Sequence, residues 1–488
     1  MPPAAAMPET LTPDICVVGG GSAGLSVAAG AAAFGEDVVL VEKGRMGGDC
    51  LNTGCVPSKA LIAAAARVKA GREAARFLVP PASPGGNAGE PAVDMAAVMG
   101  HVRSAIEAIA PNDSVERFTR LGVRVVPAEA RFADAATLVA GDIVIRPRRF
   151  VLATGSRPFV PPVPGLADAA HLTNETLFGL TELPRHLLVL GGGPVGLEMA
   201  QAFRRLGSDV TLVEAGQPLA HDDPELVAVV LERLRHEGVR ILDGSRVAAV
   251  GQGASGGIRL DVQTGGGSLR VEGTHLLVAA GRRPDLDGLN LEAAGIGFTE
   301  RGITVDGRLR TSNPRVYAIG DVNGGPQFTH WAAYQADRVL RSILFRFGGR
   351  ANPDLLPWVT FTDPELASVG LGEDEARRRH GVVRVLRWPF ADNDRAQTDG
   401  DTSGFAKVIT TRRGRVLGAA MVGADAGEMA ALWAVAVANR LSASALAASV
   451  LPYPTRSEVA RRAAVSFYAP LAGSRWTRRA IRLLKAFG

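Results

Sequence analysis

Cysteine, lysine and long apolar runs are scarce in this chain of 488 residues. Three cysteines are too few for the disulfide framework of a secreted domain. No uncharged apolar run approaches the roughly 18–20 residues that a membrane-spanning helix needs. The first residues also lack the basic and apolar stretches of a signal peptide. We therefore expect a cytoplasmic protein.

The composition is that of a globular protein with several domains. Hydrophobic residues make up 47% and charged residues 21%, which excludes a disordered or fibrous chain. Such a length predicts about three domains. Only five of the 54 cationic side chains are lysines, so a lysine within a motif is unlikely to be compositional noise. The net charge of +5 equals the five cations of residues 473–488, so the remaining chain is neutral and does not predict nucleic-acid binding.

A segment near the N-terminus recurs 172 residues later. Each copy has an apolar strand, a GGGxxG turn, an alanine-rich helical stretch and a second strand that ends in glutamate, 23 residues after the first glycine. This strand–turn–helix pattern followed by an acid is the fingerprint of a dinucleotide site. The first copy supplies Gly19, Gly21, Ser22, Ala23, Gly24 and Glu42, and the second supplies Gly191, Gly193, Val195, Gly196 and Glu214.

Two bound dinucleotides explain both copies. Glycines let the backbone approach a pyrophosphate at the positive end of a helix, and the glutamate accepts hydrogen bonds from a ribose. Two plain strand–helix units with chance glycines are disfavoured because the full fingerprint occurs twice. Each copy also has a similar closing strand, 150–158 and 276–284, in which Gly155 and Gly281 permit close approach to a cofactor.

Two of the three cysteines, Cys50 and Cys55, fall within six residues of each other. Pro57 suits the first turn of a helix, which places Cys55 at a helix N-terminus with Lys59 one turn later. A zinc site is the competing interpretation, but it needs about four ligands. Two unrelated buried thiols are a further alternative, and a redox-active disulfide is favoured over both. Cys16 lies inside the first strand and is expected in the core.

The segment GGDCLNTGCVPSK, residues 47–59, resembles the active-site signature of the pyridine nucleotide-disulfide oxidoreductases, which include dihydrolipoyl dehydrogenase, glutathione reductase and mercuric reductase. The resemblance covers residues 13–470, and residues 316–321 look like the second FAD motif of that family. It implies an α/β fold with two Rossmann-like dinucleotide-binding domains, for FAD and NAD(P), and a C-terminal α+β dimerisation domain.

The resemblance also implies domain boundaries. The FAD-binding domain would comprise residues 1–158 and, with the central part, residues 285–355. The NAD(P)H-binding domain would span 159–284. The dimerisation domain would span 356–488 and end in a basic tail, 473–488.

The same resemblance assigns roles to individual residues. Cys55 would face the flavin as its charge-transfer thiolate, and Cys50 would be the outer, attacking thiol. Lys59 would sit near flavin N5 and pair with Glu198. Asp321 would bind the ribityl chain of FAD, and Glu42 its adenosine ribose. Further FAD contacts would come from Lys43, Gly48, Ala130, Thr154, Gly155, Ser156, Gly320, Thr329 and His330, the last two at the start of a helix aimed at the flavin.

NADH is expected in preference to NADPH. Glu214 would repel a 2′-phosphate, and residues 215–217 offer no cation to bind one.

One position departs from the disulfide-reducing members of the family. They present a histidine from the partner subunit, whereas this chain has Tyr453, with Glu458 retained five residues later. Tyrosine is a poor thiol base at neutral pH. Two interpretations of Tyr453 stay open: it has a role in the reaction, or it is only a packing residue. Mercuric reductases also carry tyrosine and resemble residues 359–365, but they use a C-terminal cysteine pair, and this chain has no cysteine after Cys55.

The expected protein is a homodimeric FAD enzyme that uses NADH to reduce a disulfide or similar soft acceptor through its cysteine pair. A metal-ion reductase of the mercuric type, a flavin diaphorase and a membrane-docked flavoprotein subunit are the alternatives. No resident metal is expected.

The basic tail has the pattern of an amphipathic helix. Such a helix lies on an anionic membrane surface or docks on a partner, so peripheral contact with the inner face of the membrane is one expectation. A terminal helix packed at the dimer interface is the alternative. Residues 80–91 are expected to form a surface loop.

Overall fold

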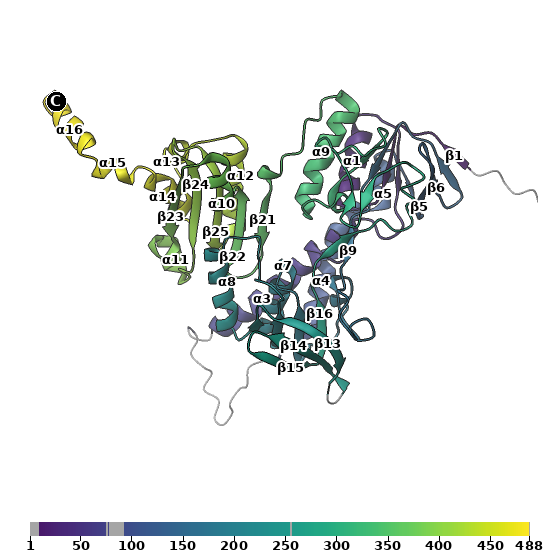
Figure 1. Ribbon diagram of the computed structural model, residues 1–488, viewed down its shortest axis with the longest axis horizontal. Helices are drawn as coiled ribbons and strands as arrows, with labels where there is room; N and C mark the ends of the chain where they lie inside the picture. The colour runs from purple at the N-terminus through teal and green to yellow at the C-terminus, as the bar shows by residue number, and fades with distance from the viewer. Residues whose placement is uncertain (1–8, 75–76, 78–91, 254–255, 488) are drawn as a thin grey trace, which may run out of the picture. The chain divides into compact units, whose positions relative to one another are not determined.

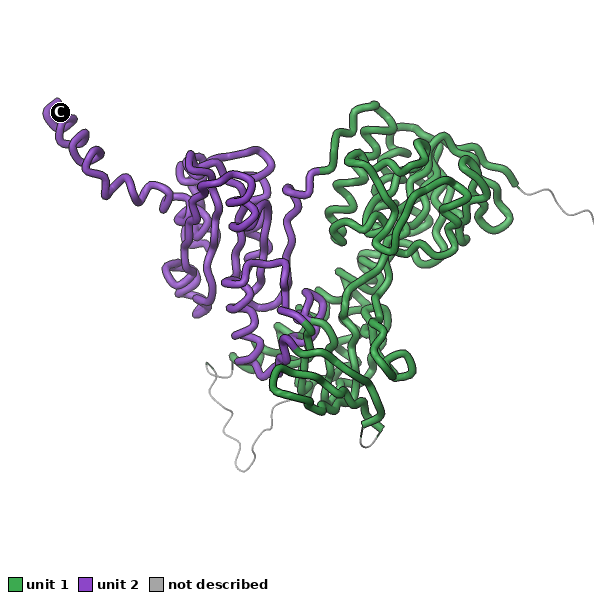
Figure 2. The backbone as a smooth tube through the Cα atoms, in the orientation of Figure 1, with its two compact units in different colours: residues 1–191, 202–215, 245–351 green, residues 192–201, 216–244, 352–488 purple. Residues whose placement is uncertain are grey.

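The computed structural model describes residues 9–74, 77, 92–253 and 256–487, and the loop expected at 80–91 lies outside these residues. The chain forms two compact units (Figures 1 and 2). The first consists of Met1–Gly191, Ala202–Ala215 and Ser245–Ala351. The second consists of Gly192–Gln201, Gly216–Gly244 and Asn352–Gly488. The four-part domain division expected from the sequence stays a prediction.

A parallel five-stranded sheet forms the centre of the first unit, in the order β20-β8-β2-β3-β4. Its central strands are fully buried runs of mostly β-branched residues, which suit a parallel sheet covered on both faces. Helices α1 and α9 lie side by side on one face and share a hydrophobic core with it (Figure 1). The bounds are β2 (Ile15–Val18), β3 (Val38–Val41), β4 (Val123–Val126), β8 (Arg149–Leu152), β20 (Val316–Ala318), α1 (Ser22–Ala33) and α9 (Thr329–Phe345).

The second copy of the repeat has the same local order of elements. β10 (His186–Leu190) pairs in parallel with β11 (Asp209–Val213) and β16 (His275–Val278). α7 (Pro194–Leu206) follows β10, just as α1 follows β2. The strand–turn–helix–strand pattern predicted for both copies is therefore confirmed.

Smaller sheets and helices complete the first unit. β1 (Glu9–Leu11), β7 (Ile143–Ile145), β6 (Thr137–Ala140) and β5 (Ala130–Asp134) form one sheet, and β13 (Arg246–Gln252), β14 (Ile258–Thr264) and β15 (Gly267–Gly273) form another. β9 (Ser156–Pro158) pairs with β17 (Arg282–Pro284), and β18 (Phe298–Thr299) with β19 (Gly302–Ile303). The helices include α2 (Gly48–Asn52), α3 (Cys55–Ala74), α4 (Met95–Ile109), α5 (Val115–Arg120) and α6 (Asn174–Leu177).

An antiparallel sheet in the order β21-β22-β25-β24-β23 forms the body of the second unit. Trp433 on α12 is fully buried in its core, together with the inner face of α14. The strands are β21 (Pro357–Thr360), β22 (Glu365–Gly370), β23 (Val383–Pro389), β24 (Phe405–Thr411) and β25 (Val416–Gly423). The helices include α8 (Pro224–His236), α10 (Glu373–His380), α11 (Asp394–Asp399), α12 (Ala426–Ala438), α13 (Ala443–Ala447) and α14 (Glu458–Ser466), and β12 (Arg240–Leu242) belongs to the same unit.

The chain ends in two short helices that project from this body, α15 (Ala469–Gly473) and α16 (Arg475–Leu484) (Figure 1). Among the helices within the described ranges, none has the length and apolar character needed to cross a membrane.

Candidate functional site

The first glycine of each fingerprint lies against the strand that closes its sheet. At Gly19, φ is +108°, and a Cβ would lie 2.3 Å from the carbonyl oxygen of Ala153. At Gly191, φ is +117°, and a Cβ would lie 2.3 Å from the carbonyl oxygen of Ala279. Only glycine fits either position. The two turns are thus built alike, which is the local geometry that the repeat predicts.

The turn after β2 presents an open surface. A Cβ at Gly21 would meet nothing closer than the Cα of Gly48, at 3.8 Å. One at Gly155 would meet no atom within 4 Å. Ser22 and Ala23 begin α1 directly behind the turn, and Gly24 packs too closely on Gly19 for a side chain to fit. An anionic group therefore has both room and a helix N-terminus at this turn.

Glu42 follows the end of β3 and is held by the turn itself. Its carboxylate accepts hydrogen bonds from the backbone N–H groups of Gly20 and Gly44. These bonds fix the acid beside the glycines, where the ribose of a dinucleotide would meet it. The neighbouring Lys43 pairs with Asp285 at 3.1 Å, and Thr154 Oγ1 donates to the carbonyl of Asp285 at 2.8 Å.

Asp321 follows β20, the strand at one edge of the parallel five-stranded sheet. Burial raises the pKa of its carboxyl, against a hydrogen bond of 2.6 Å that Ser156 Oγ donates to it. Arg282 Nε donates to the same Ser156 Oγ at 2.8 Å and forms an ion pair with Asp49 at 3.3 Å. Gly320 precedes Asp321 and donates its N–H to the buried Gln335 at 2.7 Å. The predicted residues Ser156, Gly320 and Asp321 are therefore brought together.

Cys50 and Cys55 interact directly, and both are free thiols. A hydrogen bond from Cys50 lowers the pKa of Cys55 from 9.0 to about 6, with further lowering by Thr329 and by the charge of Lys59. The pKa of Cys50 is raised by the same hydrogen bond and by burial. The two pKa shifts have opposite directions, so the reduced pair favours the proton on Cys50 and the negative charge on Cys55. The predicted disulfide between them stays a prediction.

Two helices begin at this sulfur pair. Cys55 is the first residue of α3, as predicted, and its Sγ lies 3.4 Å from Oγ1 of Thr329, the first residue of α9. His330 follows Thr329 in the first turn of α9. Cys16 is fully buried in β2, which confirms its predicted place in the core.

The second fingerprint continues beyond Gly191 with an equally open turn. A Cβ at Gly193 would meet no atom within 4 Å, and Val195 is 46% exposed at the start of α7. Gly196 continues that helix. At the end of β11, the carbonyl of Glu214 accepts a hydrogen bond from Ser245 N at 2.9 Å. Gly281 has φ +113° and open space where a side chain would lie.

Three predicted catalytic residues belong to the second unit. Glu198 is 4% exposed on α7 and accepts a hydrogen bond of 2.9 Å from the backbone of Phe361. Tyr453 is 69% exposed, and its hydroxyl donates to Asp394 Oδ2 at 2.8 Å. Glu458 begins α14 and accepts from Arg462 at 3.0 Å. The pairing of Lys59 with Glu198 stays a prediction.

Ala130 begins β5 and is 6% exposed, so its side chain is part of the core.

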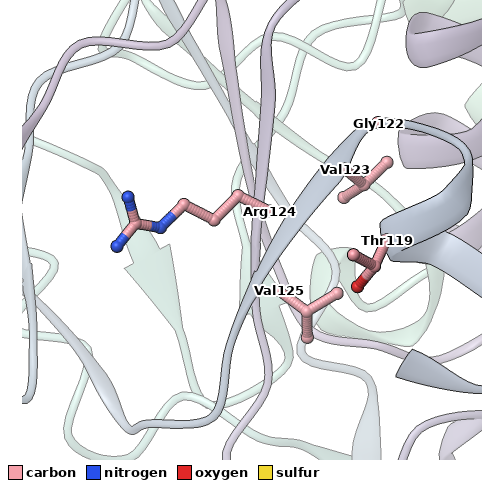
Figure 3. Close-up of a pocket in the computed structure, with 5 residues that line it drawn as sticks. All are labelled: Thr119, Gly122, Val123, Arg124 and Val125. Atoms are coloured by element: carbon pink, nitrogen blue, oxygen red, sulfur yellow. The ribbon is translucent and has the colours of Figure 1, made fainter. Parts of the chain in front are cut away.

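A hollow of about 370 Å³ lies along β4, where Arg124 points away from Val123 and Thr119 (Figure 3). Arg124 pairs there with Glu9 at 2.7 Å. Within the described parts of the chain, no group of three or more His, Cys, Asp or Glu side chains is placed to hold a metal ion.

Comparison with known proteins decides the family. Residues 13–336 match pyridine nucleotide-disulphide oxidoreductases, and residues 356–464 match the dimerisation domain of those enzymes. This chain belongs to that family. Its FAD dependence, its use of NAD(P)H and its fold class of two Rossmann-type domains with a dimerisation domain follow from this membership.

Curated relatives carry two different names. A mercuric reductase of Streptomyces lividans is 36% identical over 467 residues, covering 94% of this chain and 97% of the relative. A dihydrolipoyl dehydrogenase of Geobacillus stearothermophilus is 34% identical over 460 residues, covering 92% and 95%.

Solved structures of the family superpose on this oxidoreductase. The Cu(II) complex of the HOCl-induced flavoprotein disulfide reductase RclA from Escherichia coli gives a TM-score of 0.81 at 27% identity, covering 93% of this chain and 99% of that one. LpdA from Mycobacterium tuberculosis gives 0.83 at 27% identity, covering 94% and 99%.

The sequence did not predict two polar residues that contact predicted site residues, one in each unit. Arg282 joins Ser156 to Asp49, the residue before Cys50, and Asp394 fixes the hydroxyl of Tyr453. The sequence signal for Arg282 is its place after Gly281, where the first copy of the repeat has Ser156 after Gly155. For Asp394 the sequence carries no signal.

Proposed function

We propose that this oxidoreductase uses NADH and FAD to reduce a disulfide, or a similarly soft acceptor, through Cys50 and Cys55. The unequal thiol pair carries this proposal. A pair with one thiolate and one thiol, at the N-termini of two helices, suits thiol–disulfide exchange.

The chain's residues divide the exchange between them. Cys50 passes its proton to the Cys55 thiolate and attacks one sulfur of the acceptor disulfide, so that the acceptor's second sulfur leaves as a thiolate. Cys55 then attacks Cys50 of the mixed disulfide, closes the Cys50–Cys55 bond and gives its proton to a departing sulfur. Two electrons have passed to the acceptor, which leaves as one thiol and one thiolate. Bound FAD supplies the two electrons that restore the dithiol, taken from the nicotinamide.

The open turn at Gly21, the fixed carboxylate of Glu42 and the half-buried Asp321 fit FAD. They would hold its pyrophosphate, adenosine ribose and ribityl chain in turn. The fingerprint from Gly191 to Glu214 would hold the nicotinamide dinucleotide. Because Glu214 repels a 2′-phosphate, kcat/KM should be higher for NADH. An NADPH value equal to or above the NADH value would contradict this choice.

A metal-ion reductase is the second candidate for the same site. Tyr453 in place of a histidine base and the naming of the Streptomyces lividans relative favour it. The lack of a cysteine after Cys55 disfavours it, because no second thiol pair is available to deliver a soft metal ion. Metal-dependent NADH oxidation in the absence of any disulfide would move this candidate ahead.

An anaerobic titration of the purified holoprotein with NADH tests the thiol relay. In the wild type, two electrons should produce a long-wavelength absorbance band, because opening the Cys50–Cys55 disulfide would free the Cys55 thiolate to donate charge to the oxidised flavin. Cys50→Ser blocks the disulfide, and Cys16→Ala is the matched control because Cys16 is buried in β2. If NADH bleaches the flavin absorbance equally in the wild type and in Cys50→Ser, and the wild type shows no such band, the electrons bypass the cysteines. The protein would then be a flavin diaphorase.

A homodimer is proposed as the working form. The second unit contains the family's dimerisation domain, and Tyr453 is exposed where a second copy can reach it. Tyr453 and Glu458 would then serve the partner's cysteine pair. Sedimentation equilibrium measures the mass directly, and a monomer with full activity would contradict the shared site.

The C-terminal helix is proposed to contact an anionic membrane surface. On α16, Trp476, Ala480, Leu483 and Leu484 share one side, and Arg475, Arg478 and Arg482 lie on the rest of the helix surface. Arg479 lies at the border, with its guanidinium over the Trp476 ring. Trp476 is 78% exposed and Leu483 is 66% exposed, so the apolar side is uncovered in the chain. The segment 473–488 holds no acid and lies beyond the dimerisation match, which ends at 464. Its charge complements anionic lipid.

Liposome co-sedimentation tests the tail. The wild type should pellet with phosphatidylglycerol vesicles and remain in the supernatant with phosphatidylcholine vesicles, and a chain lacking 473–488 should not pellet with either. Trp476→Ser with Leu483→Ser keeps every charge and should weaken pelleting strongly. If the deletion changes the oligomeric state and leaves pelleting unchanged, the helix serves the dimer interface instead.

A further inference from the structure

A second polar pocket lies at the opposite end of the first unit's sheet from the fingerprint turn. Arg149 begins β8 and pairs with Ile15, whereas Gly19 follows the far end of the same strand pair. The pocket encloses about 230 Å³. Its polar lining comes from Arg149, Arg310, Tyr317, Ser342 and Arg346.

The arginines of this pocket have no counter-charge among the residues that line it. Within the residues that the structure describes, Arg149, Arg310 and Arg346 make no ion pair, and the lining contains no carboxylate. Arg310 Nε is buried and has no hydrogen-bond partner in the described chain. Within the described residues, the side chain of Arg149 donates to the carbonyl of Arg148 at 2.8 Å. A buried donor left unpaired is costly, so this arrangement indicates a missing acceptor.

The electrostatics at Arg149 agree with that geometry. Burial lowers its pKa, Tyr317 acts in the opposite direction, and the charges of Arg148, Arg346 and Arg315 lower the pKa further. The C-terminal end of α9, which contributes Ser342 and leads into Arg346, offers only about half a negative charge. Three guanidinium groups therefore face one cavity with a large excess of positive charge.

We propose that this pocket binds a phosphate group. Guanidinium groups are planar forks of N–H donors that match the oxygens of phosphate in pairs, and the buried Arg310 Nε–H supplies a donor that no residue uses. Tyr317 and Ser342, both buried against the cavity, add hydroxyl groups that can donate as well. The ligand is inorganic phosphate or the terminal phosphate of a small metabolite.

Thermal unfolding of the FAD-loaded protein with saturating NAD⁺ tests this site, because the nucleotide then keeps the fingerprint turns filled. Inorganic phosphate should raise the midpoint temperature of unfolding above its value in chloride of equal ionic strength, and this increase should level off at high phosphate concentration. Arg310→Gln and Arg149→Gln should each weaken phosphate binding roughly tenfold to hundredfold. Arg308→Gln, an exposed arginine two positions from Arg310, is the matched control and should respond like the wild type.

Two further measurements keep the test decisive. Isothermal titration of phosphate into folded wild type and Arg310→Gln gives affinities that do not depend on the stability of either variant. Glycerol 3-phosphate, titrated in place of inorganic phosphate, distinguishes the two kinds of ligand. It should bind to a site for phosphorylated metabolites and should not bind to a site for inorganic phosphate alone. Equal midpoints in phosphate and chloride, or an unchanged phosphate affinity in Arg310→Gln, would overturn the proposal.

Discussion

The Sγ atom of Cys55 lies 3.4 Å from Oγ1 of Thr329, so the first residues of two helices meet at one sulfur. Helices α3 and α9 each direct a partial positive charge of about half a unit toward it. The hydroxyl of Thr329 and the ammonium of Lys59 add to this effect. The site thus stabilises a thiolate by several independent means, and the contribution of each can be measured by substitution.

Removing the Thr329 hydroxyl should raise the pKa of Cys55. Thr329→Val keeps the shape of the side chain and loses the hydrogen bond, so we expect an upward shift of about 0.5–1 pKa unit. The ultraviolet absorbance of the thiolate, followed as a function of pH in the reduced protein, measures it. Thr304→Val, at an exposed threonine, should leave the curve unchanged. An unchanged curve in Thr329→Val would mean that the hydroxyl does not donate to the sulfur.

The rate of alkylation should follow the same titration. Since the thiolate is the nucleophile and the pKa of Cys55 is lowered to about 6, iodoacetamide should react faster as the pH rises through 6 and level off above it. Cys50→Ala removes the largest cause of the lowering, so the midpoint should move upward by roughly one to two units. Buried Cys16 does not compete for the reagent. A midpoint near 9 in the wild type would contradict the shared-proton pair.

The parts of this site that could be predicted are those encoded locally. Gly19 and Gly191 each lie within a continuous strand–turn–helix segment, and Cys55 precedes a proline that marks a helix start. Contacts between distant segments could not be predicted. Arg282 and Ser156 are 126 positions apart, and Tyr453 and Asp394 are 59 apart, and neither pairing leaves a periodic trace in the sequence. The phosphate pocket is hidden for the same reason, because Arg149 and Arg310 meet through the pairing of β8 with β20 and the bridge from Arg310 to Tyr317 of β20.

A histidine at position 453 should improve disulfide turnover. Tyr453 donates its hydroxyl to Asp394 and its pKa is raised by that bond, so it accepts no thiol proton near neutral pH. Tyr453→His supplies a base with a pKa near 6.5, and kcat/KM for lipoamide should rise about tenfold or more. Tyr453→Phe tests the hydroxyl alone. Equal activity of the wild type, Tyr453→Phe and Tyr453→His would show that this residue only packs.

Removing the buried cation Lys407 should lower the free energy of unfolding strongly. It is one of five lysines, its side chain is 3% exposed on β24, and its Nζ lies 2.6 Å from Asp223, 3.0 Å from Glu225 and 2.9 Å from Glu373. Lys407→Met leaves these carboxylates without their shared cation, which should lower the free energy of unfolding by about 3–5 kcal/mol. Arg387→Met removes a cation that also pairs with Glu225 but lies half-exposed, so it should cost only about 0–1 kcal/mol.

The pKa of Lys407 is raised from 10.5 to about 12, by Asp223 first among its three acid partners and against burial, which lowers it. A raised lysine pKa contributes stability that is fully present below pH 10.5 and is lost as the pH rises through about 12. The difference in unfolding free energy between the wild type and Lys407→Met should therefore be constant from pH 7 to 9 and shrink above that range. Chemical denaturation at several pH values measures it, with Arg387→Met as the control. Equal stability of Lys407→Met and the wild type at pH 7 would mean that the three carboxylates relax into solvent, and that the cation does not hold α8 and α10 to β24.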